Sequence, residues 1–270
     1  MSTCPRFSCT PGRTKAAVNT MLAAPRWPCD CMPTYELLSF ASDDALVGAV
    51  ARRWLERLAA RRNKNAPYCV ALSGGRIAKK FFAAVAERAQ APSVPLTEVH
   101  FFWGDERCVA PSDAESNFAL AKAHLLDPLG IPPDKIHRVR GEISPKRAAA
   151  EAEAEICRIA PMNAAGQPVL DLILLGMGED GHVASLFPGA WDEVVRSKSV
   201  YVPVVAPKPP PQRITVTFAT IAVARQAWVL ASGAGKENAL RESLSASGNT
   251  PLARVLQMRQ SSLIFSNIAK

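Results

Sequence analysis

The sequence predicts an α/β fold, with a single doubly wound, mostly parallel sheet flanked by helices in a three-layer, Rossmann-like arrangement. Apolar runs without polar alternation, typical of strands buried on both faces, occur at 68–72, 99–103, 170–175 and 226–231. Helical patterns separate these runs, and neither an internal repeat nor a linker interrupts the alternation. We therefore expect residues 33–270 to form one domain.

The other elements follow in chain order. A short edge strand is expected at 35–40, and Ser42 is one of the candidate N-caps for a helix with apolar spacing from Leu46 to Leu58. Ser144 and Pro145 open another helix, because Ser caps and Pro at the first position are start signals. The remaining helices are expected at about 78–88, 117–126, 237–244 and 251–256, and further strands at 136–139, 200–205 and 213–218.

Composition limits the partners and the compartment. The net charge is +8, but residues 1–29 hold four Lys or Arg and no acid, so half of the excess lies in this leader. No basic run with interleaved aromatics occurs, so no nucleic-acid partner is expected. No stretch reaches the roughly 18–20 apolar residues of a membrane span. The seven cysteines are scattered without a C-x-x-C pair, which fits a reducing, cytoplasmic location.

Residues 1–32 are rich in Pro, Arg, Ser, Thr and Cys and lack apolar periodicity. We interpret them as a disordered or loosely attached leader. The lack of acids is typical of a transit peptide, but no clear amphipathic helix is present, and an over-long start is a further interpretation.

A glycine-rich loop follows the third apolar run. Gly176, Gly178 and Gly181 lie within six positions, and glycine permits sharp turns and close approach of other groups. Asp180 and His182 therefore lie just past the carboxyl end of a buried strand, where open α/β sheets bind ligands. The residues after His182 are expected to start a helix that points its first N–H groups into the same crevice. A solvated histidine and a turn-forming aspartate are the simpler interpretation.

The segment 176–189 (GMGEDGHVASLFPG) resembles the signature of the lactonase branch of the glucosamine-6-phosphate isomerase/6-phosphogluconolactonase family. As a local match it is long and specific. The resemblance implies that His182 acts as a catalytic base for water and that Asp180 orients its ring or its loop.

A second loop connects the strand 68–72 to a helix through Ser73, Gly74 and Gly75. Strand, small-residue turn and helix cradle phosphate, because bare N–H groups and the positive helix end face the anion. The loop is similar to the family's Leu-Ser-Gly-Gly loop, but the Thr-Pro that usually follows is Ile-Ala at 77–78. This departure removes a hydroxyl donor and a rigid residue, and Arg76, Lys79 and Lys80 are candidates to supply charge instead.

Three charged residues, Asp105, Glu106 and Arg107, follow the strand 99–103 directly. A salt-bridged turn is the simpler interpretation. The segment resembles the family's second signature, in which the lactonases carry Asp-Glu-Arg and the deaminases Asp-Glu-Tyr. The resemblance implies that these residues contact the substrate, with Arg107 holding an oxyanion or the phosphate through paired N–H groups.

Two further cations complete the predicted site. Arg213 lies in the segment 211–215 (PQRIT), which resembles a third signature whose arginine helps bind the sugar phosphate. Lys236 follows a glycine-rich strand end and matches the family's lysine, although a surface helix residue is the alternative. Residues 208–212 are interpreted as a stiff connector.

The resemblance implies hydrolysis of 6-phosphoglucono-δ-lactone to 6-phosphogluconate in the oxidative pentose phosphate pathway. The expected partner is a small phosphorylated sugar lactone, and no cofactor is needed. A metal held by Asp180 and His182 is not expected without a third ligand. Covalent catalysis by Ser185 is not expected because G-x-S-x-G is absent.

Two alternatives stay open. A glucosamine-6-phosphate deaminase/isomerase shares the fold and the Asp-Gly-His loop, but Arg107 and the segment 184–188 disfavour it. A non-catalytic sugar-phosphate-binding regulator is disfavoured by the retained His182 and by a leader without a helix-turn-helix segment. The oligomeric state is left open.

Overall fold

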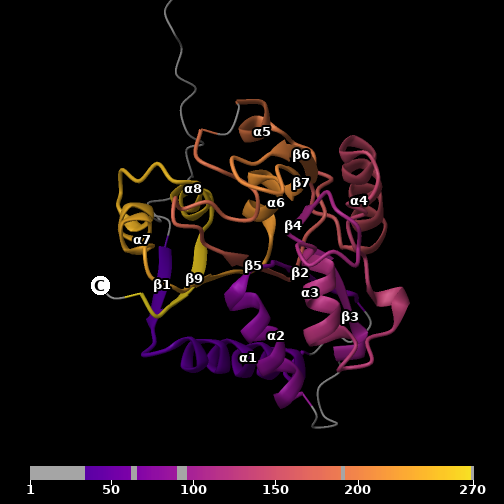
Figure 1. Cartoon of the computed structure of the whole chain (residues 1–270), viewed down its shortest axis with the longest axis horizontal. Coiled ribbons are helices and arrows are strands. Elements are labelled where there is room, and N and C mark those ends of the chain that lie inside the picture. The colour runs from indigo at the N-terminus through magenta and orange to yellow at the C-terminus, as the bar shows by residue number, and fades with distance from the viewer. Residues whose placement is uncertain (1–33, 62–65, 90–95, 190–191, 269–270) are drawn as a thin grey trace, which may run out of the picture. The chain divides into compact units, whose positions relative to one another are not determined.

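The largest sheet has six strands, all paired in parallel, in the order β1-β9-β8-β5-β2-β3 (Figure 1). The computed structural model describes residues 34–61, 66–89, 96–189 and 192–268, so the expected leader 1–32 lies outside it. The predicted α/β class is confirmed. The strands are β1 (Thr34–Ser39), β2 (Tyr68–Leu72), β3 (Val99–Trp103), β5 (Leu172–Gly176), β8 (Ala227–Ala231) and β9 (Ser261–Ser266).

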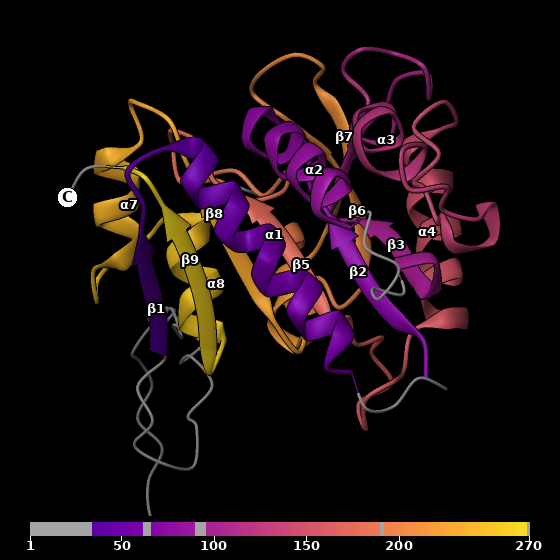
Figure 2. The same ribbon diagram turned by 90° about the horizontal axis from the view of Figure 1, so that it is seen from below.

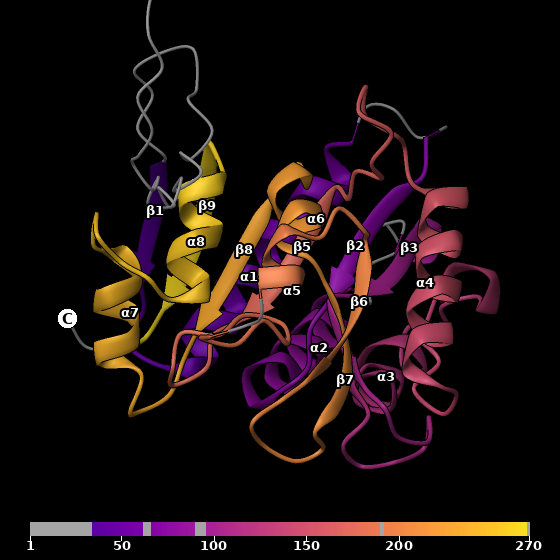
Figure 3. The ribbon, with the colours of Figure 1, turned by 90° about the horizontal axis from the view of Figure 1, so that it is seen from above.

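Helices cover both faces of this sheet. Helices α1 and α2 pack on each other over one face, and α6 and α8 lie on the other (Figures 2 and 3). None of the helices within the described ranges has the length and apolar content that a bilayer crossing requires. The helices are α1 (Asp43–Ala59), α2 (Arg76–Arg88), α3 (Asn117–Ala121), α4 (Pro145–Ile159), α5 (Asp192–Arg196), α6 (Phe218–Val223), α7 (Glu237–Leu244) and α8 (Pro251–Met258).

The core forms between these layers. Helix α1 shows the local logic, because its apolar residues recur at helical spacing and are buried, while Ser42 Oγ accepts the N–H of Ala45 at 3.2 Å as the N-cap. The indoles of Trp54, Trp103 and Trp228 are fully buried. Burial of a large apolar side chain stabilises a fold by about 1.5–3 kcal/mol, so this core holds the strand ends rigidly in place.

A second, smaller sheet distinguishes the structure from the sequence prediction of one sheet. Strands β4 (Asp105–Arg107), β7 (Gln212–Val216) and β6 (Tyr201–Val205) pair in antiparallel order. The hydroxyl of Tyr201 donates to the carbonyl of Trp103 at 2.8 Å and ties this sheet to the main one. The expected loop at 105–107 is therefore a strand, with Arg107 directly opposite Arg213.

The helix predicted after His182 is wrong. Val183 and Leu186 instead form an isolated bridge, and Ala184 between them has φ +49°. The physical reason lies just downstream, because Pro188 disfavours helical backbone at Phe187. No helix N-terminus therefore points from this loop into the crevice.

The strand predicted at 136–139 is also wrong. Ile136 makes only an isolated bridge with Phe101, because the chain turns at Val139, whose carbonyl accepts the N–H of Gly141. The helix predicted at 117–126 ends as α3 at Ala121 and continues as one π-helical turn to Leu126.

Candidate active site

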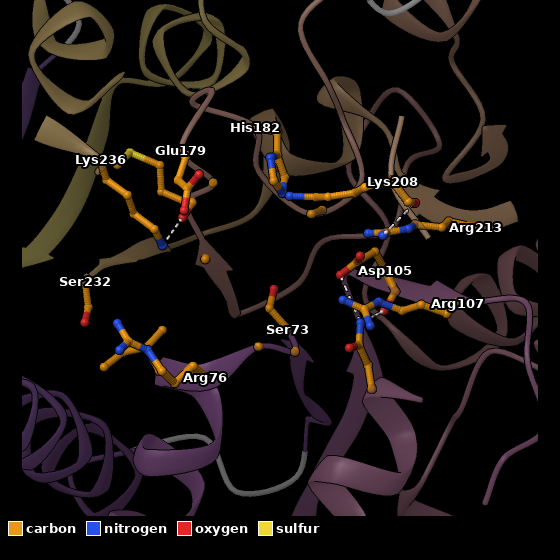
Figure 4. A pocket seen from close by; sticks show the side chains of 18 residues that line it. Ser73, Arg76, Asp105, Arg107, Glu179, His182, Lys208, Arg213, Ser232 and Lys236 are labelled. Carbon is orange, nitrogen blue, oxygen red and sulfur yellow. Dashed lines mark hydrogen bonds between the residues drawn. The ribbon is translucent and has the colours of Figure 1, made fainter. Parts of the chain in front are cut away.

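A pocket of about 300 Å³ lies at the carboxyl ends of β2, β5 and β8, bordered by β4 and β7 of the small sheet. This is the edge at which the sequence places its candidate residues. Figure 4 shows them facing one another from several elements. The predicted residues that line the pocket are Ser73, Gly74, Gly75, Arg76, Asp105, Arg107, His182, Arg213 and Lys236.

The imidazole of His182 stands on one wall of this pocket, held by Asp180. Nδ1 of His182 lies 2.5 Å from Oδ1 of Asp180, and the same oxygen accepts the backbone N–H of His182. Since a carboxylate only accepts, Nδ1 donates and Nε2 keeps its lone pair. Asp180 does not line the pocket itself, so its contact with a ligand runs through the ring.

Two features of the loop fix this ring. A side chain at Gly178 would overlap the imidazole, because a Cβ there would lie 2.0 Å from Nδ1 of His182. On the other side the ring packs against Phe187, with centroids 4.5 Å apart. The glycine that the sequence marks as a turn residue is thus required for close approach of the histidine.

The protonation state of His182 suits a base. Burial lowers the pKa of the imidazole, and Asp180 acts in the opposite direction without cancelling the effect. For Asp180 itself, burial raises the carboxyl pKa, but the hydrogen bonds from His182 outweigh burial and lower it. At neutral pH the pair is therefore a neutral imidazole beside a carboxylate.

One side of the pocket, which we call the α2 end, is formed by Arg76, Ser232 and Lys236 (Figure 4). Helix α2 begins here at Arg76, and its N-cap, Gly75, provides no side-chain cap. The first N–H groups of a 13-residue helix are thus left for another acceptor. Gly75 has φ +95°, which favours glycine at this turn.

The cations of the α2 end lie close together. Nζ of Lys236 donates to the carbonyl of Met177 at 2.5 Å, and its pKa is lowered by burial and by the nearby Arg76 guanidinium. Gly233 permits this crowding, since a Cβ there would lie 2.5 Å from a terminal nitrogen of Arg76. An anion bound at this end would relieve the mutual repulsion of the two cations.

The opposite side, which we call the β4 end, is formed by Asp105, Arg107, Lys208 and Arg213 (Figure 4). A terminal nitrogen of Arg107 donates to the backbone carbonyl of Glu115 at 2.8 Å and contacts its carboxylate at 3.2 Å. The Nε of Arg107 is buried and has no hydrogen-bond partner among the described residues. Arg107 is thus oriented, and its other terminal nitrogen makes no hydrogen bond within the described residues.

Arg213 has a different environment from Lys236. It is 3% exposed, its Nε donates to the carbonyl of Pro210 at 3.0 Å, and its guanidinium lies over the Phe187 ring. These contacts fix the loop that carries Lys208 to the rim of the pocket. Burial, followed by the neighbouring Arg107, lowers the pKa of Arg213.

Ser73 and Gly74 also have structural reasons for their identity. The hydroxyl of Ser73 donates to the carbonyl of Leu174 at 2.6 Å, which links β2 to β5. A Cβ at Gly74 would lie 1.7 Å from Oδ1 of Asn117. The amide of Asn117 in turn donates to the backbone carbonyl of Asp105 at 2.9 Å, so these loops hold one another.

Glu106, which the sequence analysis places among the substrate contacts, does not line the pocket. Its carboxylate accepts the N–H groups of Asn117 and Phe118 at 2.8 Å each, at the start of α3. Burial raises the pKa of Glu106 to about 7 against these hydrogen bonds. In the structure this residue positions the loop and α3.

Several lining residues escape the sequence analysis. Lys208 lies in a segment interpreted as a connector, and only its isolated charge beside three prolines could have indicated it. Asn117 is expected only as the first residue of the helix 117–126, with no role in the site. Glu179 belongs to the polar cluster with Asp180 and His182, and Ser232 lies in the strand end before Lys236, but neither is assigned a role from the sequence.

Ser185 is not paired with His182. Its hydroxyl donates to Oδ2 of Asp105 at 2.7 Å, and the side chain is 1% exposed. Within the described ranges, no group of three His, Cys, Asp or Glu side chains is arranged to hold a metal ion.

Comparisons with known proteins identify the family. Residues 41–265 match the family model described as glucosamine-6-phosphate isomerases/6-phosphogluconolactonase. The chain is 32% identical over 221 residues to the 6-phosphogluconolactonase of Streptomyces coelicolor, covering 80% of this chain and 85% of the relative. It is 38% identical over 174 residues to that of Treponema pallidum, covering 63% and 70%.

Solved structures give the same picture. The 6-phosphogluconolactonase of Trypanosoma brucei superposes with a TM-score of 0.76 at 27% identity, covering 86% of this chain and 96% of that one. A monomeric glucosamine-6-phosphate deaminase superposes with a TM-score of 0.71 at 16% identity, which shows the shared fold alone.

Proposed function

This chain belongs to the glucosamine-6-phosphate isomerase/6-phosphogluconolactonase family, and we propose that its pocket hydrolyses 6-phosphoglucono-δ-lactone to 6-phosphogluconate. The reaction is the lactone-opening step of the oxidative pentose phosphate pathway. One observation carries the proposal: a neutral imidazole, held by a carboxylate, lies between two groups of cations in a single pocket.

The α2 end binds the phosphate in this proposal. Its support is the uncapped start of α2 together with Arg76 and Lys236, which are the groups that favour a dianion. Anchoring the phosphate there places the rest of the sugar across the pocket, toward His182 and the β4 end. Such positioning converts hydrolysis by water into a nearly unimolecular step.

His182 is the general base. Its Nε2 removes a proton from water as the water oxygen attacks the lactone carbonyl, which forms a tetrahedral oxyanion. The bond between the carbonyl carbon and the ring oxygen then breaks, and the imidazolium returns the proton to the departing oxygen. Asp180 keeps Nδ1 protonated and stabilises the transient imidazolium.

Arg107 stabilises the oxyanion. The support is that its guanidinium lines the pocket and is held in place by Glu115, because an oriented charged donor stabilises the charge that develops in the transition state. The carboxylate of Asp105 accepts hydrogen bonds from the hydroxyl of Ser185 and the amide of Asn117. Its remaining lone pairs accept hydrogen bonds from the sugar hydroxyl groups. Arg213 positions the loop of Lys208, although the sequence analysis assigns it to the phosphate.

We also propose a cytoplasmic location. The three described cysteines, Cys69, Cys108 and Cys157, are free thiols, which is usual in a reducing compartment. The partner of the site is a small phosphorylated lactone.

Acid release from 6-phosphogluconolactone in a pH-stat tests the proposed function. The protein is expected to accelerate release well above the spontaneous background. No acceleration, with ammonia release from glucosamine 6-phosphate instead, would assign the pocket to the deaminase reaction.

A further inference from the structure

A second cavity, of about 370 Å³, lies at the opposite edge of the main sheet, at the amino ends of β1, β8 and β9. It shares no lining residue with the candidate active site. Figure 2 shows α1 running along the sheet so that its carboxyl end reaches this edge. From this geometry we propose that the cavity is a second anion site, which binds phosphate monoesters with a polyhydroxylated body.

Positive charge is the first reason. Arg53 and Arg57 lie one helical turn apart on α1, and Arg225 precedes β8, so three guanidinium groups line one cavity. Neither Arg53 nor Arg57 has an acidic partner among the described residues. Arginine is the side chain best suited to phosphate, because its N–H groups pair with two oxygens at once.

Negative charge does not cancel this excess. Glu36 is the one carboxylate on the described wall of the cavity, and Asp171 nearby is paired with Nε of Arg225 at 3.2 Å. The arginines of α1 thus remain in surplus over Glu36. That carboxylate is an acceptor for hydroxyl groups, as expected where a polyol body adjoins a phosphate.

A buried hydroxyl without a partner is the second, independent reason. Ser262 lines the cavity and is 4% exposed, and its Oγ makes no hydrogen bond within the described part of the chain. Buried polar groups are normally paired, because leaving one unpaired costs about 1–3 kcal/mol. A phosphate or sugar oxygen in the cavity would accept this hydroxyl.

Polar groups are also available for the body of the ligand. Gln226 uses its amide oxygen to accept the indole N–H of Trp228 at 3.0 Å, which leaves its NH₂ group as a donor. The ring of Tyr35, 40% exposed, forms part of the rim. A cavity of this size accommodates more than the phosphate group alone.

Calorimetric titration with glucose 6-phosphate tests the proposal, using inorganic phosphate as a second probe. In Arg53→Gln and Arg57→Gln, one binding event should weaken at least 10-fold, and Ser262→Ala should weaken the same event several-fold. Arg52→Gln is the matched control, because Arg52 is exposed on the same helix but does not line the cavity. It should bind as the wild type does.

The failure of this inference is distinguishable from failure of the proposed function. Lys236→Gln removes only binding at the active site, so an event that survives it and disappears in Arg53→Gln belongs to the second cavity. Binding that is unchanged in Arg53→Gln and Arg57→Gln, or equally weakened in Arg52→Gln, would overturn the proposal. So would the absence of any event that depends on Arg53 with either probe at millimolar concentration.

Discussion

The two ends of the active-site pocket use positive charge differently. At the α2 end, the chain leaves a helix start without a cap and crowds Lys236 against Arg76. At the β4 end, Arg107 and Arg213 each donate to backbone carbonyls of the protein, at Glu115 and Pro210. The first arrangement places two cations beside a helix start, whereas the second orients its guanidinium groups through the backbone. We therefore propose that the α2 end binds the substrate phosphate and that the β4 end, with His182, carries the reaction.

Replacement of His182 is expected to have the largest effect on turnover. His182→Asn should lower kcat by about 10²–10⁴-fold for both 6-phosphogluconolactone and unphosphorylated gluconolactone, since the base acts on the carbonyl in either. Steady-state rates in a pH-stat measure this. Wild-type turnover in the variant would remove the histidine from the mechanism.

Replacement of Lys236 tests phosphate binding at the α2 end. Lys236→Gln should raise KM for the phosphorylated lactone by about 10- to 100-fold, the value of about 1.5–3 kcal/mol for a charged hydrogen bond, and leave kcat nearly unchanged. Lys79→Gln is the control, because Lys79 is exposed on α2 and does not line the pocket. An equal effect on gluconolactone would contradict phosphate anchoring.

Asp180→Asn tests, through the pH dependence of kcat/KM, whether the pKa of His182 controls the reaction. Asp180 raises the pKa of His182, so its neutralisation should move the acid limb of kcat/KM to lower pH. The plateau should fall by about 10-fold or more, because a charge-assisted hydrogen bond is lost. A pH–rate profile measures both. An unshifted acid limb would mean that His182 does not set it.

Arg213→Gln decides between the sequence assignment and the structural one. If Arg213 positions the Lys208 loop, activity toward both lactones should fall by a similar factor, on the order of several-fold. A selective loss of the phosphorylated substrate would instead return Arg213 to the phosphate, as its signature implies.

The smallest predicted effect is on the free energy of unfolding at acid pH, which does not depend on the reaction. Nδ1 of His100 lies 2.9 Å from Nε2 of His137. Burial lowers the pKa of both imidazoles, that of His100 to about 4. The unfolded chain therefore binds more protons below pH 6.5, so stability should decline as pH falls from about 6.5 toward 4. Urea denaturation at several pH values checks this. His100→Gln should show a weaker pH dependence, and an unchanged slope would exclude the histidine pair.

Much of the fold follows from the sequence, because a strand buried on both faces leaves a continuous apolar run, as at Leu172–Gly176. The small sheet was harder to predict. Arg107 pairs with Arg213 across about a hundred residues, and no local pattern encodes that pairing. The helix expected after His182 does not form, because Pro188 disfavours helical backbone at Phe187, and Ala184 takes a left-handed conformation.

The residues of the candidate site also differ in how far the sequence predicts them. Residues in glycine-rich strand ends, such as Ser73 and His182, are predictable because the turn marks them. Lys208 is not, because only tertiary contacts between Arg213 and the carbonyls of its loop bring it to the rim. The resemblance to the second signature assigns Glu106 to the substrate, whereas its carboxylate accepts N–H groups at the start of α3.

The central claim is that the α2 end binds the phosphate while His182 acts on the lactone carbonyl. The ratio of kcat/KM for 6-phosphogluconolactone to that for gluconolactone tests this claim most directly. The account predicts that Lys236→Gln lowers this ratio by about 10-fold or more, and that His182→Asn leaves it unchanged while both rates fall. A ratio that falls in His182→Asn, or that stays at the wild-type value in Lys236→Gln, would contradict the account.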